Sequence, residues 1–302
     1  MNFKRIFHSA LWAFVFILHI TTSYAEQAQR PGAINFKQLL QAADFSNAAY
    51  QTKAEIQQLS KLHHYDLTGY GNIPELEVSY FLLTDNLNKS QVIVVRGTSN
   101  IENALVNANI QLTQDPYTKV RLHAGFLQTA RKVYFVLKPL LKSDYAITTT
   151  GHSLGGAVAL IIGIYLDVDH FRVQQVVTFG QPKVTNIAGA VKINHLNITR
   201  VVMPKDLVPL VPLLDPMDIH NMDVYWHAGK EVVLLQGKDY AVLEGMDSML
   251  RATRFTQEEL SEQNMEEHRM SSYLAKLQEK IPLARQVPFK NNLNLFNLFN
   301  SE

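Results

Sequence analysis

The chain has 302 residues, with 28 Lys and Arg against 27 Asp and Glu, so its net charge is close to zero. This balance provides none of the basic face that nucleic-acid binding requires, and no nucleic-acid partner is expected. Hydrophobic residues make up 47% of the chain, which is enough for one large domain with a substantial core. There is no cysteine, so an exported form would be held together by its core alone.

The N-terminus has the pattern of an export signal. The basic pair Lys4 and Arg5 precedes an apolar run, and residues 23–25 have the small-x-small form of a cleavage site. We therefore predict a signal peptide over residues 1–25, a single domain over residues 26–302, and a secreted or periplasmic location. The apolar run is short and soon interrupted, so no integral membrane span is expected after cleavage. An uncleaved N-terminal anchor is the alternative.

Two helix starts open the predicted domain. Asn35 with Gln38, and Thr52 with Glu55, each place a side-chain acceptor three residues before a Gln or Glu, as in a capping box. They predict two helices, the first amphipathic and the second ending near Leu62.

Strand and helix patterns then alternate along the chain. Runs rich in β-branched and aromatic residues predict strands, and apolar residues at helical spacing predict helices. This alternation predicts an α/β fold with a mainly parallel sheet that helices cover on both faces. The predicted strands are 77–84, 91–96, 145–150, 173–179, 198–203 and, as the last one, 231–235. The predicted helices are 125–141, 157–165, 186–193 and 270–281.

The most informative stretch is Gly-His-Ser-Leu-Gly at residues 151–155, between a predicted strand and a predicted helix. A strand that turns abruptly into a helix lifts the hydroxyl of its turn residue, Ser153, above the sheet. Gly151 and Gly155 are needed because a Cβ there would collide with backbone in so tight a turn. The helix start directs N–H groups towards a developing oxyanion, so Ser153 is predicted to be a nucleophile and the Leu154 N–H an oxyanion donor.

A nucleophilic serine needs a histidine to remove its proton and a carboxylate to orient that histidine. In this type of fold the acid and then the histidine follow the serine in the chain. Asp206 is the best acid, because it follows the predicted strand 198–203 in a loop that prolines hold rigid. A solvated loop aspartate is the alternative interpretation of Asp206. Its competitors are Asp167, Asp169, Asp215, Asp218 and Asp223.

Two histidines compete to be the base. His227 precedes the last predicted strand and would lie at its starting end, whereas His268 follows that strand, where a catalytic loop belongs. The spacing favours His268 and leaves His227 open.

Eight short motifs follow one another in a specific order, although each alone is modest. They are residues 45–50, 95–98, 123–126, the serine motif, 178–182, the Asp206 loop, 227–231 and 268–273. Together they resemble the class 3 lipase family, the fungal-type triacylglycerol lipases, over about residues 36–274. The resemblance implies an α/β-hydrolase fold, with a mainly parallel central sheet, flanking helices and a short helical lid.

The resemblance also implies roles for single residues. Asp206 matches the triad acid and His268 the triad base, whereas His227 and His123 match structural histidines of the family. His152 lies beside the nucleophile, and its side chain is expected to point away from the site.

A second oxyanion donor is expected in the loop after the strand that ends at residues 96–97. Thr98 has both an N–H and a hydroxyl there, and the family uses the residue after Arg-Gly for this purpose. Each such donor contributes roughly 3–4 kcal/mol to stabilising the transition state. An ordinary cap after a strand is the alternative interpretation of Thr98.

The next segment has the pattern of a short amphipathic helix. Ile101, Ala104, Leu105 and Ala108 share one helical face. The resemblance makes this segment a lid that binds substrate, and a small surface helix is the alternative. The family commonly has tryptophan at the place of Ala104 and aspartate at the place of Asn107, and these two departures weaken the apolar anchor of a lid that opens at an interface.

The resemblance thus implies a secreted serine carboxylester hydrolase that forms an acyl-enzyme, with acylglycerols as substrates, as in a triacylglycerol lipase at a lipid–water interface. A phospholipase A1 or a feruloyl-type esterase is the alternative within this class. A catalytically idle lipid-binding protein is the alternative outside it. The expected partner is a lipid or ester substrate, and no cofactor or metal is expected.

Overall fold

The computed structural model describes five stretches of the chain, residues 34–98, 111–212, 223–252, 261–281 and 283–289. The chain divides into two units, Met1–Asn35 and Phe36–Glu302, and the elements below belong to the second. The predicted signal peptide, residues 1–25, lies outside the described residues and stays a prediction. In the described stretches, no helix is both long and apolar enough to cross a membrane.

Nine strands of the described residues form one sheet. Across the sheet they are β1 (Asp66–Ile73), β2 (Val78–Asp85), β3 (Ser90–Val95), β6 (Ala146–His152), β7 (Arg172–Phe179), β9 (Ile198–Val202), β11 (Lys230–Leu234), β12 (Asp239–Leu243) and β13 (Arg285–Gln286). The five strands from β3 to β11 pair in parallel, whereas β1, β2 and β3 pair antiparallel, as do β11 and β12. The prediction of a mainly parallel central sheet is confirmed.

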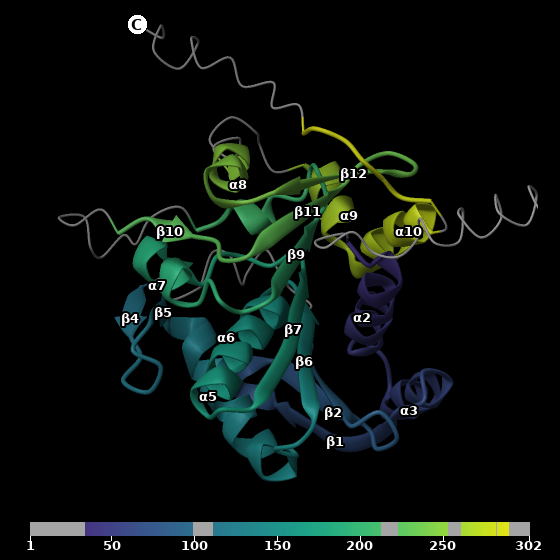
Figure 1. The fold of residues 1–302 in the computed structure, drawn as a ribbon, viewed down its shortest axis with the longest axis vertical. Coiled ribbons are helices and arrows are strands. Elements are labelled where there is room, and N and C mark those ends of the chain that lie inside the picture. The colour runs from purple at the N-terminus through teal and green to yellow at the C-terminus, as the bar shows by residue number, and fades with distance from the viewer. Residues whose placement is uncertain (1–33, 99–110, 213–222, 253–260, 282, 290–302) are drawn as a thin grey trace, which may run out of the picture. The chain divides into compact units, whose positions relative to one another are not determined.

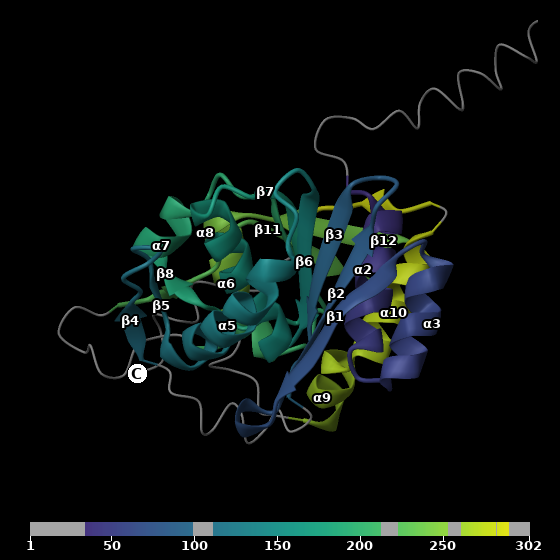
Figure 2. The same cartoon turned by 90° about the horizontal axis from the view of Figure 1, so that it is seen from below.

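Helices flank this sheet on both sides. They are α2 (Phe36–Ala48), α3 (Lys53–Leu62), α5 (Ala124–Leu137), α6 (Leu154–Val168), α7 (Ile187–Lys192), α8 (Gly245–Ala252), α9 (Glu262–His268) and α10 (Met270–Lys280), with short 3₁₀ turns η1 (Pro74–Leu76), η2 (Lys138–Leu140) and η3 (Val208–Leu210). α5 and α6 lie on one side of the central strands, and α2 and α10 lie on the other (Figures 1 and 2).

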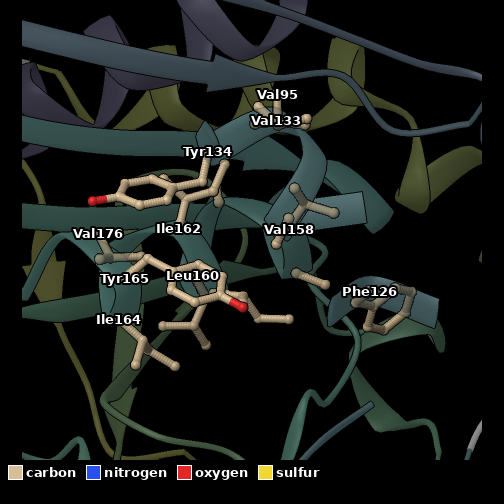
Figure 3. Close-up of a cluster of buried hydrophobic side chains, with 14 of the residues drawn as sticks. Val95, Phe126, Val133, Tyr134, Val158, Leu160, Ile162, Ile164, Tyr165 and Val176 are labelled. Atoms are coloured by element: carbon tan, nitrogen blue, oxygen red, sulfur yellow. The ribbon is translucent and has the colours of Figure 1, made fainter. Parts of the chain in front are cut away.

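The main core lies between α5, α6 and the sheet (Figure 3). α6 carries only apolar residues and glycine up to Tyr165, and nearly all of it is buried. Leu160 and Ile162 are fully buried, and the rings of Tyr165 and Tyr134 stack with centroids 5.2 Å apart. Because burying each such side chain contributes about 1.5–3 kcal/mol, this packing fixes the start of α6, which is where Ser153 lies.

A second, small sheet packs beside α7. Its strands, in order, are β10 (Tyr225–Trp226), β8 (Thr185–Asn186), β5 (Arg121–His123) and β4 (Leu112–Gln114).

The sequence located the central strands of the large sheet and six of the eight described helices, but not the edges of that sheet, the small sheet, α8 or α9. The capping box of Thr52 and Glu55 is present at the start of α3, as predicted. The expectation that residues 231–235 form the last strand is wrong, because β12 and β13 follow. β1 was not predicted, since its two glycines and an asparagine lack the β-branched signal. Gly71 leaves room for the Tyr80 ring on β2, since a Cβ there would lie 2.5 Å from the Tyr80 hydroxyl and the ring would have to move.

Candidate active site

Ser153 occupies the sharp turn between β6 and α6. Its backbone has φ 58° and ψ −132°, a strained conformation for a residue with a side chain. A Cβ on Gly155 would lie 2.2 Å from the Val95 carbonyl oxygen, and one on Gly151 would lie 2.5 Å from the Gly155 backbone. Both glycines are therefore needed for β3, β6 and α6 to approach so closely, as the sequence predicted.

Three side chains from distant parts of the chain meet at this turn. His268 Nε2 lies 3.0 Å from Ser153 Oγ, and His268 Nδ1 lies 2.9 Å from Asp206 Oδ2 and 3.0 Å from Asp206 Oδ1. All three residues are buried; Asp206 is fully buried and His268 is 5% exposed. The structure therefore brings together the serine, acid and base that the sequence and its resemblance predicted.

Asp206 is held as an ionised acceptor between β9 and η3. The Tyr273 hydroxyl donates to Oδ2 at 2.6 Å, and the Val208 N–H donates to Oδ1 at 2.9 Å. Burial alone would raise the pKa of Asp206, but the charge of His268 and these hydrogen bonds outweigh burial and lower it. An ionised Asp206 holds the proton of His268 on Nδ1, so Nε2 is left to accept a proton from Ser153.

Tyr273 is a member of this site that the sequence analysis did not assign. It lies on α10, and its hydroxyl accepts the Met203 N–H at 3.2 Å while donating to Asp206. Burial and the neighbouring carboxylate raise its pKa well above its usual value, so it remains a donor. The only sequence signal was its place in the motif of residues 268–273.

Comparison with known proteins agrees with this geometry. Residues 92–215 match the family described as Lipase (class 3). The secreted mono- and diacylglycerol lipase 1 of Fusarium solani is 30% identical over 235 residues, which cover 70% of this chain and 67% of that protein. The chain belongs to the class 3 lipase family.

Further lipases also match this chain. The lipase of Rhizopus niveus is 30% identical over 44% of this chain, but that match covers only 37% of the Rhizopus protein. The crystal structure of a lipase from Rhizopus microsporus var. chinensis superposes with a TM-score of 0.57 at 26% identity, over 66% of this chain and 74% of that chain. A Yarrowia lipolytica lipase gives 0.56 at 27% identity, over 67% and 79%. This chain is therefore a lipase, a carboxylic ester hydrolase with the α/β-hydrolase fold.

The competing histidine of this lipase lies elsewhere. His227 is buried, and its Nε2 lies 2.7 Å from the Pro209 carbonyl oxygen, which makes it a support for η3. His123 caps α5, where its Nδ1 accepts the Phe126 N–H at 3.4 Å. Both positions agree with the structural roles that the resemblance implies.

The competing aspartates have other partners. Asp167 lies 2.9 Å from His195, and Asp169 accepts hydrogen bonds from Tyr117 and Tyr134. Asp223 lies 2.7 Å from Arg121. Asp215 and Asp218 lie outside the described residues.

His152 does not point away from the site, contrary to the expectation. Its Nε2 lies 2.6 Å from the backbone oxygen of His268, and its Nδ1 lies 2.9 Å from the Tyr50 hydroxyl. The ring centroids of His152 and His268 are 4.7 Å apart. The residue before the nucleophile therefore contacts the residue placed to be its base.

The two predicted oxyanion donors flank Ser153. Leu154 is the first residue of α6, and Gly97 is so close that a Cβ there would lie 3.1 Å from Ser153 Cβ. Thr98 follows Gly97, and its hydroxyl donates to Glu77 Oε2 at 3.2 Å. The predicted lid residues Ile101, Ala104, Leu105 and Ala108, and Asn107 beside them, lie outside the described residues. Within the described stretches, no group of three or more His, Asp or Glu is placed to hold a metal ion.

Proposed function

We propose that this lipase hydrolyses acylglycerols, with Ser153 as nucleophile, His268 as base and Asp206 as the acid that orients His268. The observation that carries the proposal is the single line of contacts at 3.0 Å and 2.9 Å through the two nitrogens of His268. In this arrangement the serine proton moves to the histidine only as the serine attacks. The carboxylate orients the histidine and stabilises the positive charge that it then carries.

The chemical steps follow from these contacts. Ser153 Oγ gives its proton to His268 Nε2 as it bonds to the ester carbonyl carbon, and the backbone N–H groups of Leu154 and Thr98 receive the oxyanion. His268 then returns the proton to the departing alcohol, which leaves an acyl group on Ser153 Oγ. A water molecule then gives a proton to His268 as it attacks the acyl carbon. His268 passes this proton to Ser153 Oγ as the fatty acid leaves, which restores the serine.

The names of relatives support acylglycerols as the substrate class. The Fusarium solani and Penicillium cyclopium relatives are named secreted mono- and diacylglycerol lipases, and the Rhizopus niveus and Rhizomucor miehei relatives are named lipases. The same names support export, which the basic and apolar N-terminus also favours. The candidate substrates differ in the chemical groups that the loops around Ser153 must accommodate. They are triacylglycerols, partial glycerides, phospholipids cleaved at the first acyl position, and feruloyl esters.

The test is hydrolysis of triacylglycerol, diacylglycerol, phospholipid, feruloyl and p-nitrophenyl esters by wild type, Ser153→Ala, His268→Ala and His227→Ala. Loss of Ser153 or His268 should lower turnover by about 10⁴–10⁶, and His227→Ala should retain the chemistry in its folded fraction. If His227→Ala abolishes activity while folded His268→Ala keeps it, the assignment of the base is wrong. Adsorption to lipid without turnover of any ester would identify an idle binder instead.

A further inference from the structure

Tyr50 and His152 form a chain of hydrogen bonds behind the base. The Tyr50 hydroxyl lies 2.9 Å from His152 Nδ1, and His152 Nε2 lies 2.6 Å from the backbone oxygen of His268. Neither Tyr50 nor His152 contacts Ser153 Oγ or Asp206 through a hydrogen bond that the described residues show. They bond to each other and to the backbone of His268 rather than to the reacting atoms. Residues in such a place can act on the reaction by positioning the residues that carry it out.

The proton positions in this chain follow from the acceptor at its end. A carbonyl oxygen can only accept, so His152 must carry its proton on Nε2 and donate it to His268. Nδ1 of His152 then has a lone pair, which accepts the hydroxyl proton of Tyr50. One tautomer of His152 therefore satisfies both contacts: the His268 carbonyl requires it, and the Tyr50 hydroxyl stabilises it by donating to Nδ1.

The chain keeps this arrangement over a wide range of pH. Burial, as the main cause, and the charge of His268, as the second, lower the pKa of His152 to about 3, so the ring stays neutral. Although 37% of Tyr50 is exposed, its hydroxyl lies inward, and burial raises its pKa to about 12. His152 can therefore keep its donor on the His268 carbonyl while His268 itself gains and loses a proton.

The carbonyl that His152 binds lies at a break between two helices. His268 is the last residue of α9, and Arg269 has an extended backbone before α10 begins at Met270. The last carbonyls of a helix lack a partner within it. The donor from His152 satisfies the backbone of His268 at the point where α9 ends, and it ties this point to the residue that precedes Ser153.

The other end of the chain reaches the oxyanion side of the site. The backbone of Gly97 lies beside the Tyr50 hydroxyl, since a Cβ on Gly97 would lie 2.9 Å from that oxygen. Gly97 precedes Thr98. Tyr50 and His152 thus connect the segments that hold the oxyanion donor, the nucleophile and the base.

We infer that Tyr50 and His152 are positioning residues that hold the backbone of His268, and through it Nε2, at attacking distance from Ser153. This inference rests on the proposed function, since it assigns the proposed base its support. Displacing a reacting group by about 1 Å can cost about 10²-fold in rate. The contribution of the chain should therefore appear in turnover rather than in substrate binding.

The test compares His152→Gln, which keeps a donor able to reach the His268 carbonyl, with His152→Met, which keeps a similar length without a donor. On a soluble p-nitrophenyl ester, His152→Met should lower kcat by about 10–100-fold with KM changed less than about threefold, while His152→Gln should stay within about fivefold of wild type. Labelling of Ser153 by an organophosphonate should slow in parallel. Both variants should stay folded at the assay temperature, with His152→Met melting a few degrees lower because the His268 carbonyl loses its donor.

Tyr50→Phe provides a second test that leaves His152 in place. It removes only the hydroxyl that donates to His152 Nδ1, and it should lower kcat about three- to tenfold. Tyr65→Phe is the matched control, because the Tyr65 hydroxyl also makes one contact, with Ser90 Oγ at 3.1 Å, away from the site. Tyr65→Phe should leave kcat unchanged.

The inference is overturned if folded His152→Met turns over like wild type, or if His152→Gln and His152→Met lose activity equally while both stay folded at the assay temperature. Should His152→Met not fold, an unchanged kcat in Tyr50→Phe overturns it. A failure of the proposed function looks different, because Ser153→Ala would then keep its turnover.

Discussion

Two buried carboxylates, Asp206 in the loop after β9 and Glu231 on the neighbouring strand β11, differ in the kind of residue that they pair with. Asp206 follows β9 and faces His268, with Tyr273 as a neutral donor. Glu231 lies on β11 and is held by two guanidinium groups, those of Arg200 and Arg251. Both carboxylates are at most 1% exposed, and in both cases partners outweigh burial and lower the pKa.

The difference lies in whether the partner can change its charge. His268 can take the serine proton and pass it on, so the charge beside Asp206 can change during each reaction cycle. An arginine stays charged in a protein, so the charges beside Glu231 are permanent. The Asp206 group is suited to catalysis, and the Glu231 group is suited to holding β9, β11 and α8 together.

A buried lysine near the Glu231 group supports the loop that carries Asp206. Lys183 is fully buried near Arg200, and its Nζ donates to the Leu210 carbonyl at 2.6 Å, at the end of η3. Burial, with the charges of Arg200 and Arg251, lowers the pKa of Lys183 to about 7. Within the described stretches, neither terminal nitrogen of Arg251 has a hydrogen-bond partner. Glu231 is therefore the main compensation for several buried cations.

The largest expected effect comes from Asp206→Asn. An amide cannot hold the charged form of His268 and can favour the wrong tautomer, so kcat should fall by about 10⁴. The free energy of unfolding should change much less. The measurement is ester turnover together with urea unfolding, and the control is Asp223→Asn, whose carboxylate pairs with Arg121 away from the triad. Turnover within tenfold of wild type would exclude Asp206 as the acid.

Glu231→Gln should show the reverse pattern. It leaves Arg200 and Arg251 buried without a counter-charge, and the loss of one partner of a buried ion pair costs about 3–5 kcal/mol of stability. The folded fraction should keep its kcat. Ser248→Ala is the control, because it removes a neutral hydroxyl that accepts from Arg200 and donates to Glu231 but leaves all the charges in place, so it should cost less, about 1–3 kcal/mol. A fall in kcat with unchanged denaturant midpoint would assign Glu231 to the chemistry instead.

The sequence predicted the Asp206 group better than the Glu231 group, for a physical reason. Ser153 lies in a local strand–turn–helix pattern, and Asp206 follows a strand, so their backbone signals are local. The pairing of Arg200 with Glu231 depends on the register of β9 and β11, and α8, which supplies Arg251, was not predicted. Side-chain contacts across strands and helices leave no periodic signal in one sequence.

The same limit explains what the sequence missed inside the site. The side chain of His152 was expected to point away, because only the direction of the turn could be inferred. Tyr50 and Tyr273 meet the site from α2's end and from α10, and nothing local marks either as a partner of the triad. The choice of His268 over His227 depended on the resemblance, since spacing alone left both open.

The lowered pKa values of Asp206 and Glu231 predict that the folded protein loses stability in acid. Asp206 and Glu231 have lowered pKa values when folded, so their contribution is fully present above their unfolded pKa values, near 3.8 and 4.5, and is lost as the pH falls through the lowered folded values. Urea unfolding of wild type should therefore weaken steadily below about pH 4.5. In Glu231→Gln this dependence should be shallower. Parallel curves for the two proteins would show that Glu231 does not contribute to the acid transition.

The smallest expected effect concerns a third carboxylate, Glu77, which is exposed and accepts the Thr98 hydroxyl at 3.2 Å. Because this hydroxyl donates to Glu77, the oxyanion would depend on the backbone N–H groups of Thr98 and Leu154. Thr98→Val keeps both N–H groups, so kcat should fall by less than about tenfold, whereas loss of a whole oxyanion donor costs about 10²–10³. Thr98→Ser keeps a hydroxyl at this position, so its kcat should equal that of the wild type. If Thr98→Val instead loses the full 10²–10³, the hydroxyl itself receives the oxyanion, and the contact with Glu77 must break during each turnover.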